Sequence, residues 1–90
     1  SALEKKLAHL DLNIDAKDRP GLVHDISEVL SENSIRVENM ECHRLGLADV
    51  GTVFTSHFKI AVAENFNKEE LINSLQEISK DLVIDLHPQS

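Results

Sequence analysis

The residues best placed to do chemistry stand in one turn, Asp18-Arg19-Pro20-Gly21-Leu22. Before it, alternating apolar residues indicate a half-buried strand, and after it apolar residues recur at helical spacing over 22–30. Pro20 suits the first position of a helix, because its missing N–H would have no partner there. Gly21 has no side chain, so a ligand or another stretch of backbone can come close to it. The first N–H groups of such a helix favour a carboxylate or phosphate, and the turn therefore predicts an anion-binding corner.

Histidines are the next candidates for chemistry, and the chain has five of them. None stands at metal-ligand spacing from another. His57 and His87 are expected to flank the first strand on the open face of a sheet, with Asp11 or Asp15 between them. We interpret this group as a solvated sheet face, and we expect no metal site, no cofactor and no catalytic residue.

The single cysteine, Cys42, is expected to be a core or edge thiol. It cannot form a nucleophile pair with His43, because neighbouring residues of a strand point to opposite faces. A lone cysteine also rules out a disulfide framework within the chain, which favours a reducing, cytoplasmic compartment.

Charge and length exclude further classes of function. Nine basic and sixteen acidic side chains give a net charge of −7. This charge argues against direct contact with nucleic acid, whose affinity depends on Lys and Arg, and against an anionic membrane surface. No apolar run approaches the roughly 20 residues of a membrane span. Ninety residues indicate one domain with an aliphatic core, since only three residues are aromatic.

The first residue is Ser1 rather than Met, so we expect a tag remnant or a domain cut from a longer chain. Residues 1–7 are interpreted as a lead-in or as a tag or linker remnant. Residues 8–87 are expected to form a single domain, and residues 88–90 a tail.

Apolar periodicity and turn residues predict six elements in chain order. They are a strand at 8–16, a helix at 20–32, a strand at 35–44 with a bulge near Glu38–Asn39, a hairpin connection at 46–51, a strand at 52–62, a helix capped by Asn67, and a short strand with Leu82, Ile84 and Leu86 inward that ends at Pro88. Glu70 completes a capping-box pattern with Asn67.

This order, with right-handed crossovers, gives an α+β, ferredoxin-like βαββαβ two-layer sandwich. A four-stranded antiparallel sheet carries both helices on one face. The other face is expected to be wet, and it collects Asp11, Asn13, Asp15, Thr55, His57, Lys59, Asp85 and His87. The second and fourth strands are at the edges, and a long exposed second strand favours a homodimer or packing against a partner domain.

The turn, the helix after it and the strand that begins Ile35-Arg36-Val37 together resemble an ACT domain. The resemblance covers nearly the whole domain. Residues 18–30 and 80–86 are most similar to the second ACT domain of glycine cleavage system transcriptional repressor-like proteins. The early part also resembles the ACT domains of deformylases and of stringent-response synthetases.

The resemblance implies regulation rather than catalysis: a small effector, typically an amino acid, bound between two copies. It also implies a possible role in transcriptional control of glycine metabolism, through a transcription-factor partner rather than DNA. The ligand-facing positions it implies are Asp18, Arg19, Pro20, Gly21, Leu22 and, from a neighbouring copy, Arg36. One departure stands out, because a turn position that is often Asn in amino-acid-sensing members is Asp18 here. An Asp can hold an ammonium group, and an Arg can hold a carboxylate.

Structural interpretations of the same residues stay open at this point. Gly21 could allow close packing of the helix on the sheet, and Asp18 could hydrogen-bond within its own turn. Arg36 could be a charged residue that protects an edge strand from pairing with another chain. Together these would describe a ligand-free module for dimerisation or protein interaction.

Overall fold

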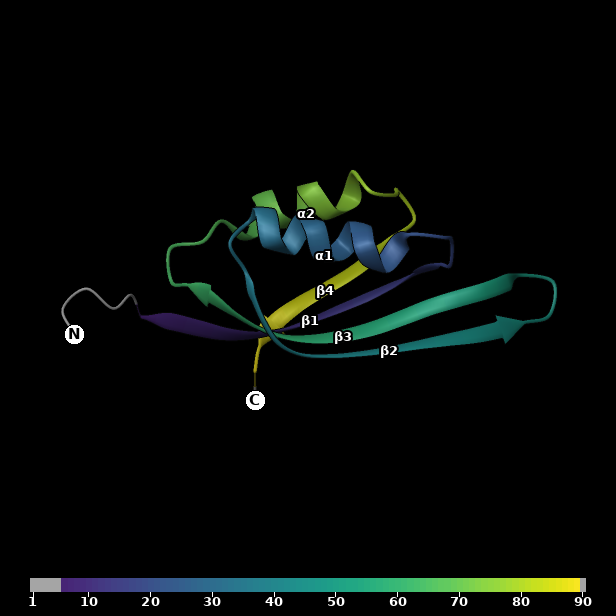
Figure 1. Ribbon diagram of the computed structural model, residues 1–90, viewed down its shortest axis with the longest axis horizontal. Coiled ribbons are helices and arrows are strands. Elements are labelled where there is room, and N and C mark those ends of the chain that lie inside the picture. The colour runs from purple at the N-terminus through teal and green to yellow at the C-terminus, as the bar shows by residue number, and fades with distance from the viewer. Residues whose placement is uncertain (1–5, 90) are drawn as a thin grey trace.

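The computed structural model describes residues 6–89. Its elements in chain order are β1 (Leu7–Lys17), α1 (Leu22–Glu32), β2 (Arg36–Leu47), β3 (Gly51–Ala63), α2 (Lys68–Gln76) and β4 (Val83–Pro88). The strands form one sheet in the order β2-β3-β1-β4, and every neighbouring pair is antiparallel. Both helices cover the same face of the sheet (Figure 1). The predicted ferredoxin-like sandwich and its two edge strands, β2 and β4, are therefore confirmed.

The alternation of apolar and polar residues along β1 gives the sheet one buried face and one solvent-exposed face. Leu12, Ile14 and Ala16 are buried under the helices, because successive side chains of a strand point to opposite faces. β3 supplies Phe54, Phe58 and Ile60 to the same core. The ladder puts the remaining polar residues of the two strands on the open face, as the pairs Asp11–Lys59, Asn13–His57 and Asp15–Thr55 show.

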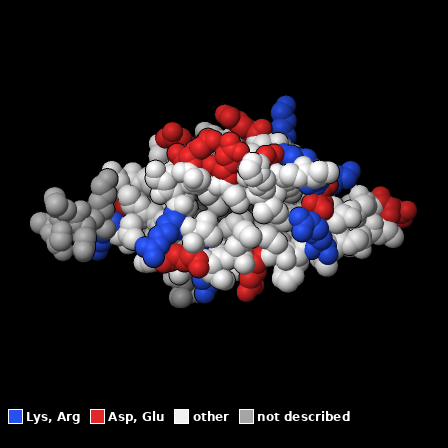
Figure 2. All heavy atoms as spheres, viewed as in Figure 1, with Lys and Arg blue, Asp and Glu red and all other residues white. Residues whose placement is uncertain are grey.

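Each helix buries a narrow apolar stripe. In α1 the buried residues are Leu22, Ile26 and Leu30. α2 begins as predicted: the side chain of Asn67 accepts a hydrogen bond from the backbone N–H of Glu70 at 3.0 Å. The outward surfaces of both helices are acidic, and Figure 2 shows red side chains gathered over this layer. Such a surface repels a phosphate backbone.

The hairpin of β2 and β3 is longer than expected. A connection over 46–51 was predicted, but β2 continues to Leu47 and β3 starts at Gly51. Gly46 does not end the strand, because it pairs with Thr52. Asp49 and Gly51 have positive φ angles and close the turn. The result is an arm that reaches beyond the helices (Figure 1).

Two further expectations concern the bulge in β2 and the start of β1. The bulge predicted near Glu38–Asn39 is confirmed, since the β2–β3 register shifts between Val37 and Asn39. The predicted lead-in over 1–7 falls mostly outside the described residues, and its last residue, Leu7, already belongs to β1. Within residues 6–89, neither helix is long and apolar enough to cross a membrane.

Asp81 ties the loop before β4 to the end of β1. Its carboxylate accepts a hydrogen bond from the Ser79 hydroxyl and another from the backbone N–H of Lys17 at 3.0 Å. The Ser79 hydroxyl, followed by the Lys17 amide, lowers the pKa of Asp81 below its ordinary value. The folded chain therefore holds this carboxylate in its charged form more strongly than the unfolded chain does.

We predict that Asp81→Asn lowers stability at neutral pH. The wild-type contribution is fully present above the ordinary carboxylate pKa and is lost as the pH falls through the lowered folded pKa, since the unfolded chain takes up the proton first. Urea unfolding at pH 7, 5 and 3 measures this: the difference between variant and wild type should shrink toward pH 3. A difference that stays constant with pH would contradict this account.

Candidate functional site

The predicted turn is present, but α1 begins later than expected. The helix starts at Leu22, so Pro20 lies before it, and Gly21 is the N-cap with φ 80°. A left-handed φ of this kind costs an L-residue energy, which explains a glycine here. A Cβ at this position would meet only the Arg19 Nη1 atom, at 3.9 Å. Close packing of helix on sheet therefore does not require Gly21.

Arg19 folds back over the start of α1. Its Nη2 atom donates to Asp25 Oδ2 at 2.7 Å, and its Nη1 atom donates to the carbonyl of Pro20 at 3.1 Å. The side chain stays 40% exposed. No side chain caps the helix, and the first N–H groups of a helix have no partner within it. The Leu22 N–H already donates to the Arg19 carbonyl at 3.3 Å, so the corner offers the next N–H groups of α1 beside a guanidinium group.

Asp18 lies under this corner and is only 20% exposed at its side chain. Its backbone N–H donates to the carbonyl of Thr52 at 2.9 Å, which extends the β1–β3 ladder by one bond. One carboxylate oxygen, Oδ2, accepts from Arg44 Nε at 3.0 Å. The other, Oδ1, is buried and has no hydrogen-bond partner among the described residues. A buried acceptor without a donor costs about 1–3 kcal/mol, so this atom is suited to an incoming donor.

Arg44 is the residue that the sequence interpretation missed. It comes from β2 opposite Phe54, and its guanidinium lies 5.5 Å from the centre of that ring. Burial raises the pKa of the Cys42 thiol, and the positive charge of Arg44 offsets part of that rise. The signal in the sequence was parity: Arg44 shares the helix-facing side of β2 with Met40 and Cys42, where an apolar residue would be ordinary.

Arg36 lies far from this corner within one chain. It stands at the start of β2, opposite Ala61. Eight residues separate it from Arg44, which is about 26 Å along a strand. One copy of the chain thus brings together Asp18, Arg19 and Gly21 but not Arg36.

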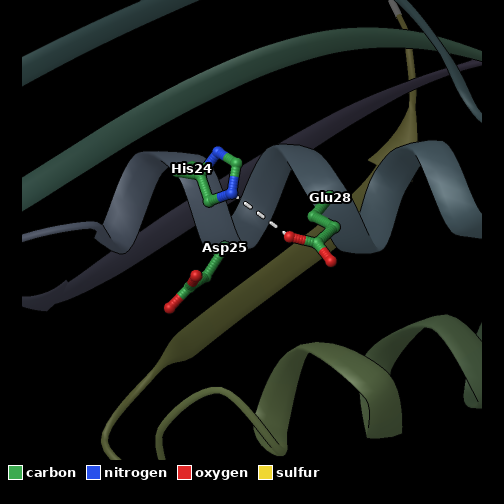
Figure 3. A group of neighbouring side chains, drawn as sticks. All are labelled: His24, Asp25 and Glu28. Atoms are coloured by element: carbon green, nitrogen blue, oxygen red, sulfur yellow. Dashed lines mark ion pairs between the residues drawn. The ribbon is translucent and has the colours of Figure 1, made fainter.

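The structure also forms two histidine groups. The sequence left open whether Asp11 or Asp15 lies between His57 and His87, and in the structure it is Asp11. Asp15 accepts a hydrogen bond from the Thr55 hydroxyl instead. The other group, His24, Asp25 and Glu28, lies on one exposed turn of α1 (Figure 3). Its signal is the spacing of three residues from Asp25 and four from His24 to Glu28, which places side chains on neighbouring positions of a helix.

Solved structures share this fold at low sequence identity. An unknown protein from Galdieria sulphuraria superposes with a TM-score of 0.83 at 19% identity, over 100% of this chain and 54% of its own. A formyltetrahydrofolate deformylase from Pseudomonas putida KT2440 gives 0.72 at 18%, over 90% of this chain and 29% of its own. A protein proposed to be a glycine cleavage system transcriptional repressor gives 0.71 at 16%, over 93% and 47%. The chain spans about half or less of each of these relatives.

The element order and the sheet define an α+β domain of the ferredoxin-like type. The family model of the ACT domain matches residues 11–78, and the chain belongs to the ACT domain family. Domains of this family are regulatory and non-catalytic, and they typically bind amino-acid effectors and dimerise. Among curated proteins, none matches this sequence.

The conformation of Gly21 gives a direct test of the turn. We predict that Gly21→Ala destabilises the fold by about 1–2 kcal/mol, because an L-residue resists positive φ. Gly46→Ala is the matched control, since no atom lies within 4 Å of its added Cβ and its φ is not in that region. Chemical unfolding should show Gly46→Ala unchanged or slightly stabilised. Equal losses in the two variants would contradict the assignment of the turn.

Proposed function

We propose that this chain is a non-catalytic sensor that binds a small amino acid at the corner formed by Asp18, Gly21 and Arg44. The observation that carries the proposal is the unpartnered, buried Oδ1 atom of Asp18 beside the uncapped start of α1. The ammonium group of an amino acid supplies the donor that this oxygen lacks, and neighbouring side chains must move to admit it, because the atom is not exposed to solvent. The carboxylate of the same ligand accepts from the first backbone N–H groups of α1 and from a guanidinium.

The edge of β2 supplies the second half of the site. Among residues 6–89, no strand pairs with its outer side, and its helix-facing residues Val37 and Met40 are 43% and 44% exposed. An unprotected edge of this length favours pairing with a second copy. An antiparallel β2–β2 pair centred on Met40 would bring the start of the partner's β2 beside Arg44, but the bulge between Val37 and Asn39 turns Arg36 to the open face, whereas Arg44 faces the helices.

In that arrangement the effector lies between two copies, as the family resemblance implies, and Arg44 rather than the partner's Arg36 is the guanidinium on the side of Asp18. Ligand and dimer then support each other, because each ligand bound at the interface favours the paired state.

A regulatory role implies that this domain controls the activity of another protein. The similarity to glycine cleavage system repressor-like proteins supports an effector from glycine metabolism and a transcription factor as partner in the cytoplasm. The net charge of −7 favours a protein partner over DNA. Measured association of this chain with duplex DNA would contradict this part of the proposal.

A second candidate is a dimerisation module with no small ligand. The exposed apolar residues of β2 and its arm favour it on their own, since they need a partner surface and no effector.

Thermal unfolding against a panel of amino acids, including glycine and serine, tests the sensor. A ligand at 100 times its Kd adds about 2.7 kcal/mol, which raises the Tm of a domain this small by roughly ten degrees or more. We expect one amino acid to raise the Tm, and Asp18→Asn and Arg44→Gln to abolish the rise. Asp49→Asn, in the hairpin turn, is the control and should keep it. A folded dimer whose Tm responds to none of them would favour the dimerisation module.

Sedimentation velocity tests the interface. We predict that the wild type is a dimer and that Met40→Lys is a folded monomer, because a charge would be buried at the centre of the β2 pair. Val83→Lys is the matched control on the opposite edge, where Val83 is 65% exposed. A dimer that survives Met40→Lys and dissociates with Val83→Lys would place the interface on β4 instead.

A further inference from the structure

Asp18 contacts both strands of the arm formed by β2 and β3. Its backbone N–H donates to the Thr52 carbonyl of β3 at 2.9 Å, and its carboxylate Oδ2 accepts from Arg44 Nε of β2 at 3.0 Å. Arg44 lies opposite Phe54, which is fully buried, and its guanidinium stands 5.5 Å from the centre of that ring. One residue after the end of β1 therefore connects the body of the domain to both halves of the hairpin.

Few other contacts hold the end of the arm within residues 6–89. This end, residues 44–53, reaches past the helices (Figure 1). The β1–β3 ladder stops at the pair Lys17–Val53, and no described strand flanks the outer side of β2. The large apolar side chains of this segment are half-exposed: Leu45, Leu47 and Val50. Segments with few buried contacts open locally at low free energy, so the Asp18 contacts have a large influence on the arm.

The ion pair of Asp18 and Arg44 holds the arm only weakly by itself. The Arg44 side chain is 52% exposed, and an ion pair that is open to water contributes little to stability. The pair is also incomplete at both ends. Asp18 Oδ1 is buried without a donor among the described residues. Arg44 donates to these residues through Nε alone, which leaves the four N–H groups of its terminal nitrogens for another acceptor.

An amino acid bound at the corner, as the proposed function requires, completes both ends of this pair. Its ammonium group donates to Asp18 Oδ1. Its carboxylate accepts from the terminal nitrogens of Arg44 as well as from the start of α1. The ligand then bridges the body of the domain and β2, and it makes both contacts only when the arm is held against the corner.

On the basis of the proposed function, we infer that effector binding fixes the arm against the body of the domain, with Asp18 as the residue that couples the site to the arm. A ligand shifts such an equilibrium by its difference in affinity for the two states. Residues 44–47 belong to β2, so the same contacts hold the outer edge along which a second copy is proposed to pair. The effect of the ligand therefore reaches the dimer edge through β2.

Hydrogen exchange of the backbone amides without any ligand tests the Asp18 contacts alone. We expect residues 44–53 to exchange roughly threefold faster or more in Asp18→Ala, relative to the amides of α2, because the local opening loses its ion pair. Asp25→Asn is the matched control. It removes the 2.7 Å ion pair with Arg19 at the same corner, and among the described residues Asp25 forms no ion pair with the arm, so arm exchange should stay as in the wild type.

Arg44→Gln removes the same ion pair from the side of β2, and it replaces Asp18→Ala should that variant fail to fold. Arm exchange equal to that of the wild type in the folded variant would overturn the inference. Acceleration of the same size in Asp25→Asn would also overturn it, because the arm would then respond to any loss of charge at the corner.

Exchange with the amino acid that raises the Tm tests the coupling. At 100 times the Kd of the ligand, an opening that destroys the site becomes roughly 100-fold rarer. We expect this slowing for residues 44–53 of the wild type and little change for the first turn of α2. A ligand that raises the Tm but leaves arm exchange unchanged would overturn the coupling while the sensor stands. If no amino acid raises the Tm, the proposed function and the ligand coupling fail together, whereas the measurement without ligand still decides whether Asp18 holds the arm.

Discussion

The register of β1 between β3 and β4 is the constraint on which the rest of the structure depends. β1 pairs along its full length with β3, and with β4 over residues 10–15. A slip of one residue would move Leu12 and Ile14 to the open face and Asp11 into the core. Ser56, the one buried polar residue of the described core, supports this register, because its hydroxyl donates to the carbonyl of Ile14 at 3.1 Å.

The same strand positions the candidate corner and the polar group of the open face. Toward its end, the ladder continues through the bond from Asp18 N–H to the Thr52 carbonyl, and this holds the Asp18 carboxylate beneath the turn. In its middle, Asp11 stands between neighbours from both flanking strands. A single register therefore holds both the corner and the contacts of Asp11 with His57 and His87 on the open face.

Much of the fold was predictable from the sequence, because its signals are local and strong. The alternation of β1 and β3, the Asn67 cap and the parity change at the bulge each follow from short-range patterns. The helix start was placed too early. Pro20 suits a first helical position, but the positive φ of Gly21 puts the helix boundary one residue after it. The predicted β2–β3 hairpin was also too short. Glycine often weakens or ends a strand, but here Gly46 stays paired with β3.

The candidate site was harder to predict because it joins residues that are distant in sequence. The turn itself was recognised, but the partner of Asp18 is Arg44, 26 positions later. Nothing local to Arg44 indicates that pair; only the strand register brings it there. Arg36 is a different case. Its predicted ligand-binding role requires a second copy of the chain, so the structure of one chain does not test it.

Chemical-shift mapping would test the central claim most directly. The ¹⁵N-labelled chain would be titrated with the amino acid that raises the Tm, while every backbone amide is followed. The account predicts that the largest changes fall on Asp18, Gly21, Leu22 and the outer edge of β2, with the distant start of α2 unaffected. Changes confined to other surfaces, with these amides unmoved, would contradict the claim that the turn before α1 is the effector site.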